Sequence, residues 1–471
     1  MQTLALPETL PVAVIGAGPV GLAAAAQLLR RGLTPLILEA GAGVGTSLRQ
    51  WGHVRLFSPW QYTVDAAARD LLAAAGWDEP EPTELPLGQE IVARYLEPLA
   101  ALPAIAAQLR LSARVTAITR QGLDKVSNTG RAAAPFAIRW TDAAGGEQMS
   151  LARAVIDASG TWTRPNPMGV DGLPVRGERA VADRIAYGIP EMLGKDRQTY
   201  AGRTVLVVGS GHSAIHAALD LLKLQETAPV TRVLWALRRN RIERLLGGGL
   251  NDQLPERGAL GLAAKQAIDA GRLEVLAPFA ATALSAAGDG VAVTGRLGAA
   301  ETTLMVDRII VCTGFRPDLD MLSELRVAVD PATEAPPALS PLIDPNLHSC
   351  GTVPPHGVDE LTQPEPGFYI VGAKSYGRAP TFLMATGYEQ VRSIAAELAG
   401  DPVAARQVHL VLPETGVCST DLVEGTAGSG CCGGPAADTG SCCAADAAAK
   451  TEGETGCGCG TAAPTRSLET A

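Results

Sequence analysis

The stretch that decides the fold is VAVIGAGPVGLAAAAQLLRRGLTPLILEA, residues 12–40. It predicts an apolar strand, a turn containing Gly16, Gly18 and Gly21, an apolar helix, and a second strand ending at Glu39. The first glycine permits a tight turn, the second lets the backbone approach a pyrophosphate, and the third lets the helix pack on the strand. A carboxylate at this distance accepts hydrogen bonds from a ribose hydroxyl. A glycine triplet alone also fits an ordinary turn, but the whole unit predicts a dinucleotide-binding βαβ fold.

A second copy of this pattern begins at TVLVVGSGHSA, residues 204–214, where Gly209, Gly211 and Ser213 occupy the turn. Alanine replaces the third glycine, which a close-packed helix position tolerates. Arg238 and Arg239 follow the next strand, where an acid is expected for a plain ribose. Two guanidinium groups suit a 2′-phosphate, so we predict NADPH as the second nucleotide. The alternative is a solvated basic pair at a strand end.

Three further apolar segments end in glycine, at Gly160, Gly314 and Gly372. We expect them to be strands; the first two mark where the chain leaves and re-enters each nucleotide fold, and one nucleotide is FAD. The fold class is therefore α/β with two Rossmann-like domains. The predicted organisation is an FAD-binding domain in two segments (residues 1–165 and residues 318–412), a linker region (166–202), an NADPH-binding domain (203–317) and a disordered Cys-rich tail (413–471).

Charge and hydropathy exclude several classes of partner. Among 471 residues, 49 acids outnumber 39 bases, and no basic block is present to attract nucleic acid. The longest apolar helical run, residues 21–29, is far shorter than the roughly 20 residues needed to cross a bilayer. The first residues also lack the basic start and apolar stretch of a secretory signal. We expect a cytoplasmic protein that binds neither nucleic acid nor membrane.

The order of these motifs resembles the flavoproteins with two dinucleotide-binding domains, from residue 10 to about 400. That group includes flavin-containing monooxygenases and the disulfide and metal-ion reductases. The reductases carry a redox cysteine pair facing the flavin, whereas no cysteine lies between Glu39 and Arg203 and the second unit holds only Cys312. Oxygen activation and direct hydride transfer to a small acceptor are the remaining common uses of NADPH with FAD.

Two segments supply candidate catalytic residues. Residues 43–60 resemble the region of flavin-containing monooxygenases that passes beside the isoalloxazine, which implies a role for Ser58. The sequence lacks that family's FxGxxxHxxx(Y/F) signature and its asparagine near this serine. Lys374 and Arg378 follow the strand ending at Gly372, where their charges would stabilise a reduced, anionic flavin. The alternative for both is an exposed loop charge.

Seven of the nine cysteines lie at or after Cys418. Glycine, alanine, serine and threonine dominate this tail, so we expect it to be disordered without metal. Its paired thiols match no zinc finger and suit a soft, thiophilic metal or metalloid. A biased tail without a role is the alternative. Cys350 and His356 lie in an earlier loop and are expected to be structural; the alternative is that this loop faces the substrate. The predicted metal ligands are Cys431, Cys432, Cys442, Cys443, Cys457 and Cys459.

Residues 207–214, 374–382 and 412–418 resemble the flavin-dependent monooxygenases of bacterial arsenic-resistance gene clusters. The resemblance implies an arsenic-linked physiological setting, in which an arsenical is one candidate for the small-molecule substrate. The leading interpretation is an FAD- and NADPH-dependent monooxygenase that works through a flavin C4a-oxygen adduct. One alternative is an NADPH-dependent metal or metalloid reductase fed by the tail thiols. Another is a non-catalytic metalloid-binding or redox-sensing flavoprotein.

Overall fold

The computed structural model describes residues 9–239, 255–347, 353–380 and 382–410. The first nucleotide unit forms one sheet of five parallel strands. Its strand order is β16 (Phe368–Ile370), β7 (Ala154–Asp157), β1 (Val12–Ile15), β2 (Pro35–Leu38) and β3 (Leu109–Arg110). The predicted strand, helix and strand of residues 12–40 are therefore present, with β1 at the centre of the sheet.

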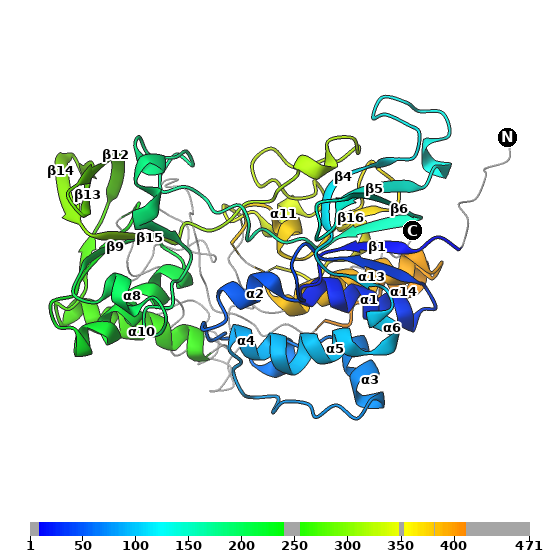
Figure 1. The fold of residues 1–471 in the computed structure, drawn as a ribbon, viewed down its shortest axis with the longest axis horizontal. Helices are drawn as coiled ribbons and strands as arrows, with labels where there is room; N and C mark the ends of the chain where they lie inside the picture. The colour runs from blue at the N-terminus through cyan, green and yellow to red at the C-terminus, as the bar shows by residue number, and fades with distance from the viewer. Residues whose placement is uncertain (1–8, 240–254, 348–352, 381, 411–471) are drawn as a thin grey trace, which may run out of the picture. The chain divides into compact units, whose positions relative to one another are not determined.

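Each face of this sheet has its own core because successive side chains of a strand point to opposite faces. Val12 and Val14 pack with α1 (Pro19–Arg30) and α13 (Met384–Leu398). Ala13 and Ile15 pack instead with an antiparallel sheet of β4 (Arg114–Arg120), β5 (Phe136–Thr141) and β6 (Glu147–Ala152). Figure 1 shows α1 and α13 beside β1, with β4, β5 and β6 across the sheet from them.

Shorter elements complete this domain. They are α2 (Thr46–Gln50), η1 (Trp60–Tyr62), α3 (Ala66–Ala74), α4 (Gly88–Ile91), η2 (Val92–Leu96), α5 (Glu97–Ala101), α6 (Pro103–Ala106), η3 (Arg131–Ala133), η6 (Asp320–Leu322), α11 (Ser340–Ile343), α12 (Val358–Leu361), η7 (Gly372–Tyr376) and α14 (Pro402–Arg406). The carboxylate of Asp65 caps α3 by accepting the N–H of Ala68. None of the helices in the described ranges is long and apolar enough to cross a membrane.

The second nucleotide unit repeats this architecture. Its parallel sheet has the order β11 (Glu274–Leu276), β10 (Arg232–Ala236), β9 (Thr204–Val208), β15 (Arg308–Val311) and β8 (Ile185–Tyr187). One face packs on α8 (His212–Thr227) and α10 (Pro255–Asp269). The other face packs on an antiparallel sheet of β12 (Phe279–Ala287), β13 (Gly290–Leu297) and β14 (Ala300–Val306). The α/β class and the two Rossmann-like sheets are confirmed.

One strand of the second sheet comes from the segment that the sequence predicted as a linker. Residues 166–202 contain η4 (Glu178–Arg184), β8 and α7 (Arg197–Tyr200), and β8 pairs in parallel with β15. The same position beside the first sheet's β7 is filled by β16, which comes from far later in the chain. Residues 166–202 therefore do more than connect, because they supply the edge strand of the second sheet. The predicted tail, residues 413–471, lies outside the described residues.

Candidate functional site

The turn after β1 has the backbone geometry that a dinucleotide site requires. Gly16 has φ +98°, and a Cβ there would lie 2.9 Å from the carbonyl oxygen of Ala158. A Cβ at Gly21 would lie 2.0 Å from the oxygen of Gly16, so the helix packs directly against the turn. No atom lies within 4 Å of a Cβ built on Gly18, the residue that caps the start of α1. The backbone is thus open at the point where a pyrophosphate approaches the helix N-terminus.

The carboxylate of Glu39 is held at the end of β2, next to this turn. It is 7% exposed, and it accepts the N–H groups of Ala17 and Gly41, each at 2.7 Å. The hydroxyl of Thr46 donates a third hydrogen bond at 3.1 Å. A carboxylate has about four lone-pair sites, so the fixed group retains capacity to accept a ribose hydroxyl. The geometry fits the role predicted for Glu39.

Two neighbouring strands end in glycines with left-handed backbone. Gly160 follows β7 with φ +72°, and Gly372 follows β16 with φ +67°. The N–H of Gly372 donates to the amide oxygen of Gln390 on α13 at 2.7 Å. Both glycines therefore lie at the carboxyl edge of the first sheet, where ligands of open α/β sheets bind.

A buried ion pair joins the ends of these two strands. The ammonium of Lys374 lies 2.7 Å from a carboxylate oxygen of Asp157 and donates to Ser159 Oγ at 3.0 Å. The side chains of Lys374 and Asp157 are 1% and 0% exposed. The sequence predicts that Lys374 stabilises reduced flavin, whereas the structure balances its charge with Asp157. Sequence reasoning missed this pair, although an aspartate ending an apolar strand signals a buried carboxylate that needs a partner.

A second buried network, made of hydrogen bonds, holds η7 in place. The amide nitrogen of Gln390 contacts His356 Nε2 at 2.9 Å and donates to Ser375 Oγ at 3.0 Å. His356 Nδ1 lies 3.0 Å from the carbonyl oxygen of Pro354, which fixes a neutral ring protonated on Nδ1. Burial lowers the pKa of His356, in agreement with this neutral form. The side chain is thus structural, as expected, and it fixes the turn that begins at Gly372.

The two predicted catalytic residues occupy different surroundings. Ser58 is buried, between η1 and the bridge that pairs Arg55 with Leu87. Arg378 follows η7 and is 39% exposed, and its guanidinium lies 2.6 Å from the carboxylate of Glu334. Ser58 and Arg378 therefore retain their predicted catalytic roles as predictions only.

The second turn has the same main features as the first. Gly209 has φ +136°, and a Cβ there would lie 2.3 Å from the carbonyl oxygen of Cys312. Gly211 caps the start of α8, and no atom lies within 4 Å of a Cβ built on it. The indole N–H of Trp235 on β10 donates to the oxygen of Gly209 at 2.8 Å, which anchors the turn. Ser213 follows in the first turn of α8, so a second pyrophosphate fits here.

The residues predicted to select NADPH lie just beyond the carboxyl end of β10. Arg238 and Arg239 are exposed, two and three residues beyond the end of β10. Gly314 follows β15 with φ +87° and occupies the place that Gly160 takes after β7. The arginines are therefore in reach of solvent and of a nucleotide lying across the strand ends.

Cys312 is a packing residue of this second turn. Gly209 contacts its carbonyl oxygen as Gly16 contacts that of Ala158, so Cys312 is the counterpart of an alanine. Burial raises the pKa of its thiol to about 12, and the thiol donates to the oxygen of Gly188 at 3.3 Å. A thiolate, the form that attacks disulfides, is therefore suppressed here.

Apart from Cys312, the described ranges of the chain contain no cysteine and no cluster of metal-binding side chains. Within them no group of three or more His, Cys, Asp or Glu side chains is placed to hold a metal ion. Cys350, Cys418 and the six predicted metal ligands, Cys431, Cys432, Cys442, Cys443, Cys457 and Cys459, lie outside the described residues.

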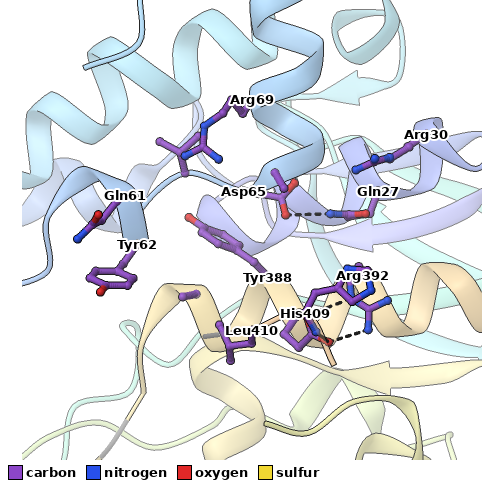
Figure 2. Close-up of a pocket in the computed structure, with 14 residues that line it drawn as sticks. Gln27, Arg30, Gln61, Tyr62, Asp65, Arg69, Tyr388, Arg392, His409 and Leu410 are labelled. Carbon is purple, nitrogen blue, oxygen red and sulfur yellow. Dashed lines mark hydrogen bonds and ion pairs between the residues drawn. The ribbon is translucent and has the colours of Figure 1, made fainter. Parts of the chain in front are cut away.

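A cavity of about 280 Å³ lies between α1, α3 and α13, away from the glycine turns (Figure 2). Gln27 and Arg30, which lie at the opposite end of α1 from Gly18, line this cavity. The carboxylate of Asp65 accepts from the Gln27 amide at 2.9 Å, and burial raises the pKa of this acid. Because it lies at the opposite end of α1 from Gly18, this cavity is not the predicted nucleotide site.

Comparisons with solved structures show the same fold at low sequence identity. The bacillithiol disulfide reductase Bdr (YpdA) from Bacillus cereus is 20% identical, with TM-score 0.60 and coverage of 83% of this chain and 99% of that chain. The FAD-bound cadaverine monooxygenase DfoA from Erwinia amylovora is 13% identical, with TM-score 0.59 and coverage of 88% and 99%. A mutant flavin monooxygenase from Stenotrophomonas maltophilia is 22% identical, with TM-score 0.51 and coverage of 83% and 98%.

The family comparison identifies the family to which most of the chain belongs. The model for the pyridine nucleotide-disulphide oxidoreductases matches residues 13–342, from the first strand of the first sheet past the last strand of the second. Both glycine turns and both parallel sheets lie largely inside this range. The chain therefore belongs to the pyridine nucleotide-disulphide oxidoreductase family and is a flavin-dependent oxidoreductase that uses a pyridine nucleotide.

Proposed function

We propose that this protein is an FAD- and NADPH-dependent monooxygenase that acts on a small trivalent arsenical. The observation that carries the proposal is the state of Cys312, the one cysteine among the described residues. Its thiol is buried, hydrogen-bonded to Gly188 and held protonated by a raised pKa. The described domains thus pair two nucleotide turns with no thiol to relay electrons from a flavin. Dioxygen is an acceptor that needs no such relay.

Each nucleotide has its own set of residues in this proposal. The open backbone at Gly18 and the fixed carboxylate of Glu39 bind the pyrophosphate and ribose of FAD. Gly211 takes the pyrophosphate of NADPH, and Arg238 and Arg239 bind its 2′-phosphate. When bound, FAD would supply the redox chemistry that links NADPH to dioxygen. The buried pair of Lys374 and Asp157 would hold the ends of β7 and β16 in place at the FAD site.

The reaction balances with one oxygen atom transferred. NADPH, a proton, dioxygen and a trivalent arsenical give NADP⁺, water and the pentavalent arsenical. Arsenic supplies the two electrons that reduce the oxygen atom it receives, and NADPH supplies the two electrons that reduce the other oxygen atom to water. The paired cysteines from Cys431 to Cys459 suit the capture of the trivalent form, because thiolates bind soft ions. The free thiol of Cys312 agrees with a reducing compartment, and we place the protein in the cytoplasm.

The test uses the full-length, FAD-loaded protein with NADPH, phenylarsine oxide and isotopically labelled dioxygen. We expect labelled oxygen in the pentavalent product, with one product formed per NADPH consumed. A chain ending at Leu410 should keep this chemistry and show a higher KM for the arsenical. Cys312→Ser should behave as wild type, because the thiol only packs. Unlabelled product, or NADPH consumption that yields only hydrogen peroxide, would contradict the proposal.

The second candidate is an NADPH-dependent metal or metalloid reductase, which the tail cysteines favour. Their adjacent thiols suit delivery of an oxidised ion to a reduced flavin. Such an enzyme consumes NADPH without oxygen when mercuric ion or a pentavalent arsenical is added. The monooxygenase consumes NADPH catalytically only when oxygen is present. An anaerobic assay of full-length and truncated protein therefore separates the two functions.

A further inference from the structure

Two arginines from separate segments converge on one glycine beside η7. From the position that a Cβ would take at Gly172, Arg316 Nη2 and Arg378 Nη1 are each 4.0 Å away. The two nitrogen atoms therefore lie within about 8 Å of each other. Burial and the nearby charge of Arg378 lower the pKa of Arg316. We propose that Arg316 and Arg378 form a two-pronged binding site for a small anion, a carboxylate or a tetrahedral oxyanion such as the pentavalent arsenical product.

Among the residues that the structure describes, a single carboxylate pairs with these two guanidinium groups. Arg316 donates to Asn166 Oδ1 at 2.7 Å and to the carbonyl oxygen of Gly172 at 3.2 Å, and both acceptors are neutral. Within the described ranges, Glu334 pairs with Arg378, and no carboxylate lies within ion-pair distance of Arg316. Two guanidinium groups beside a single carboxylate leave a net positive charge. An oxyanion satisfies it by accepting charge-assisted hydrogen bonds from both.

Both arginines are held in place by the backbone around them. Arg316 lies on the connection after β15, where its N–H donates to the carbonyl oxygen of Arg164 at 3.0 Å. Arg378 follows η7, and its N–H donates to the carbonyl oxygen of Thr333 at 2.7 Å. Glu334 has φ +57°, a left-handed conformation that is uncommon outside glycine. Such conformations cluster at ligand-binding sites, where surrounding structure maintains them.

The position of the pair connects it to the proposed reaction. Arg378 follows the turn that begins at Gly372, and Arg316 is two residues beyond Gly314, so each extends from a predicted nucleotide-binding glycine. An anion held here lies next to the edge of the first sheet. The inference rests on the proposed function only in taking this anion to be the pentavalent product. Anion binding itself is measured without NADPH or turnover, so a failed oxygenase assay does not affect it.

The test is calorimetric titration of the full-length, FAD-loaded protein with inorganic phosphate, arsenate and acetate. We expect at least one of these anions to bind, and Arg316→Gln and Arg378→Gln each to weaken it by roughly 10-fold or more. Glu334→Gln should tighten binding roughly 2- to 5-fold, because it removes the internal carboxylate that competes for Arg378. Arg406→Gln is the matched control, since that exposed arginine pairs with Asp359 and Glu397 and should change nothing.

Four results would overturn the inference. No binding of any probe, or equal dissociation constants in wild type and both arginine variants, would remove the site. A weakening by Glu334→Gln would show that the three side chains act only as a structural unit. If NADP⁺ displaces the anion and its affinity falls in the same variants, the pair binds a nucleotide phosphate and the assignment to the product anion is wrong. Circular dichroism and flavin content verify that each variant is folded. If Arg316→Gln does not fold, Glu334→Gln and Arg378→Gln still test the binding site.

Discussion

Replacing Lys374 by methionine should destabilise the first domain more than the loss of any exposed ion pair. The substitution keeps the volume of the side chain and leaves the carboxylate of Asp157, which is 0% exposed, without its cation. Leaving one partner of a buried ion pair uncompensated costs about 3–5 kcal/mol. The N–H and hydroxyl of Ser159 still donate to Asp157, at 3.1 and 2.6 Å, so we expect the lower end, about 3 kcal/mol.

A matched variant separates burial from charge. Arg378→Met breaks an ion pair of similar length, 2.6 Å, whose side chains are 39% and 28% exposed. Water replaces the lost partner there, so the expected cost is about 0–1 kcal/mol. Lys374→Met combined with Asp157→Asn removes both charges and should recover about 2 kcal/mol of the single-variant loss.

The assay is urea denaturation of the FAD-loaded proteins at fixed excess FAD, followed by flavin fluorescence and far-ultraviolet circular dichroism. The midpoint of the flavin-linked transition reports the first domain, which contains both residues. If Lys374→Met costs no more than Arg378→Met, or if Asp157→Asn gives no recovery, then the carboxylate is not buried as a charge and the reasoning fails.

Three other predictions concern the nucleotide turns and the capped helix α3. Gly18→Val should leave circular dichroism unchanged and abolish FAD binding, because its Cβ meets no protein atom but enters the path of the pyrophosphate; a yellow, FAD-loaded variant would contradict this. Arg238→Gln with Arg239→Gln should raise the KM for NADPH roughly 10-fold and leave that for NADH nearly unchanged, whereas equal losses for both nucleotides would refute the phosphate contact. Asp65→Asn keeps the cap of α3 and removes a carboxyl whose pKa is raised by burial. The native state of wild type holds this proton above the usual pKa near 4, so its stability falls as pH rises past that value. The melting-temperature advantage of Asp65→Asn should therefore grow from pH 4 to pH 7, and a constant difference would count against the raised pKa.

The sequence predicted what is encoded locally. The turns at Gly16 and Gly209 and the strands beside them follow from glycine chemistry and apolar runs within about thirty residues, and the structure confirms both sheets. The partnership of Lys374 with Asp157 was missed because 217 positions separate them, and no local pattern pairs two charges at that distance. The convergence of Arg316 and Arg378 on Gly172 likewise depends on how three segments meet. Strand β8 is only three residues long and lies in a glycine- and proline-rich region, so its pattern was too short to predict a strand.

The two sheets also differ in when their last strand is made. Every strand of the second sheet lies between Ile185 and Val311, so a ribosome that has released this continuous stretch has released the whole sheet. The first sheet is incomplete until β16 (Phe368–Ile370) has been synthesised. The core under α1 is incomplete until α13, which ends at Leu398, has been synthesised. Domains generally fold as units during synthesis, the N-terminal one first. Here we expect the reverse order: the second domain, encoded in the middle, can close first, and the first sheet is complete only when nearly all of the described chain has emerged.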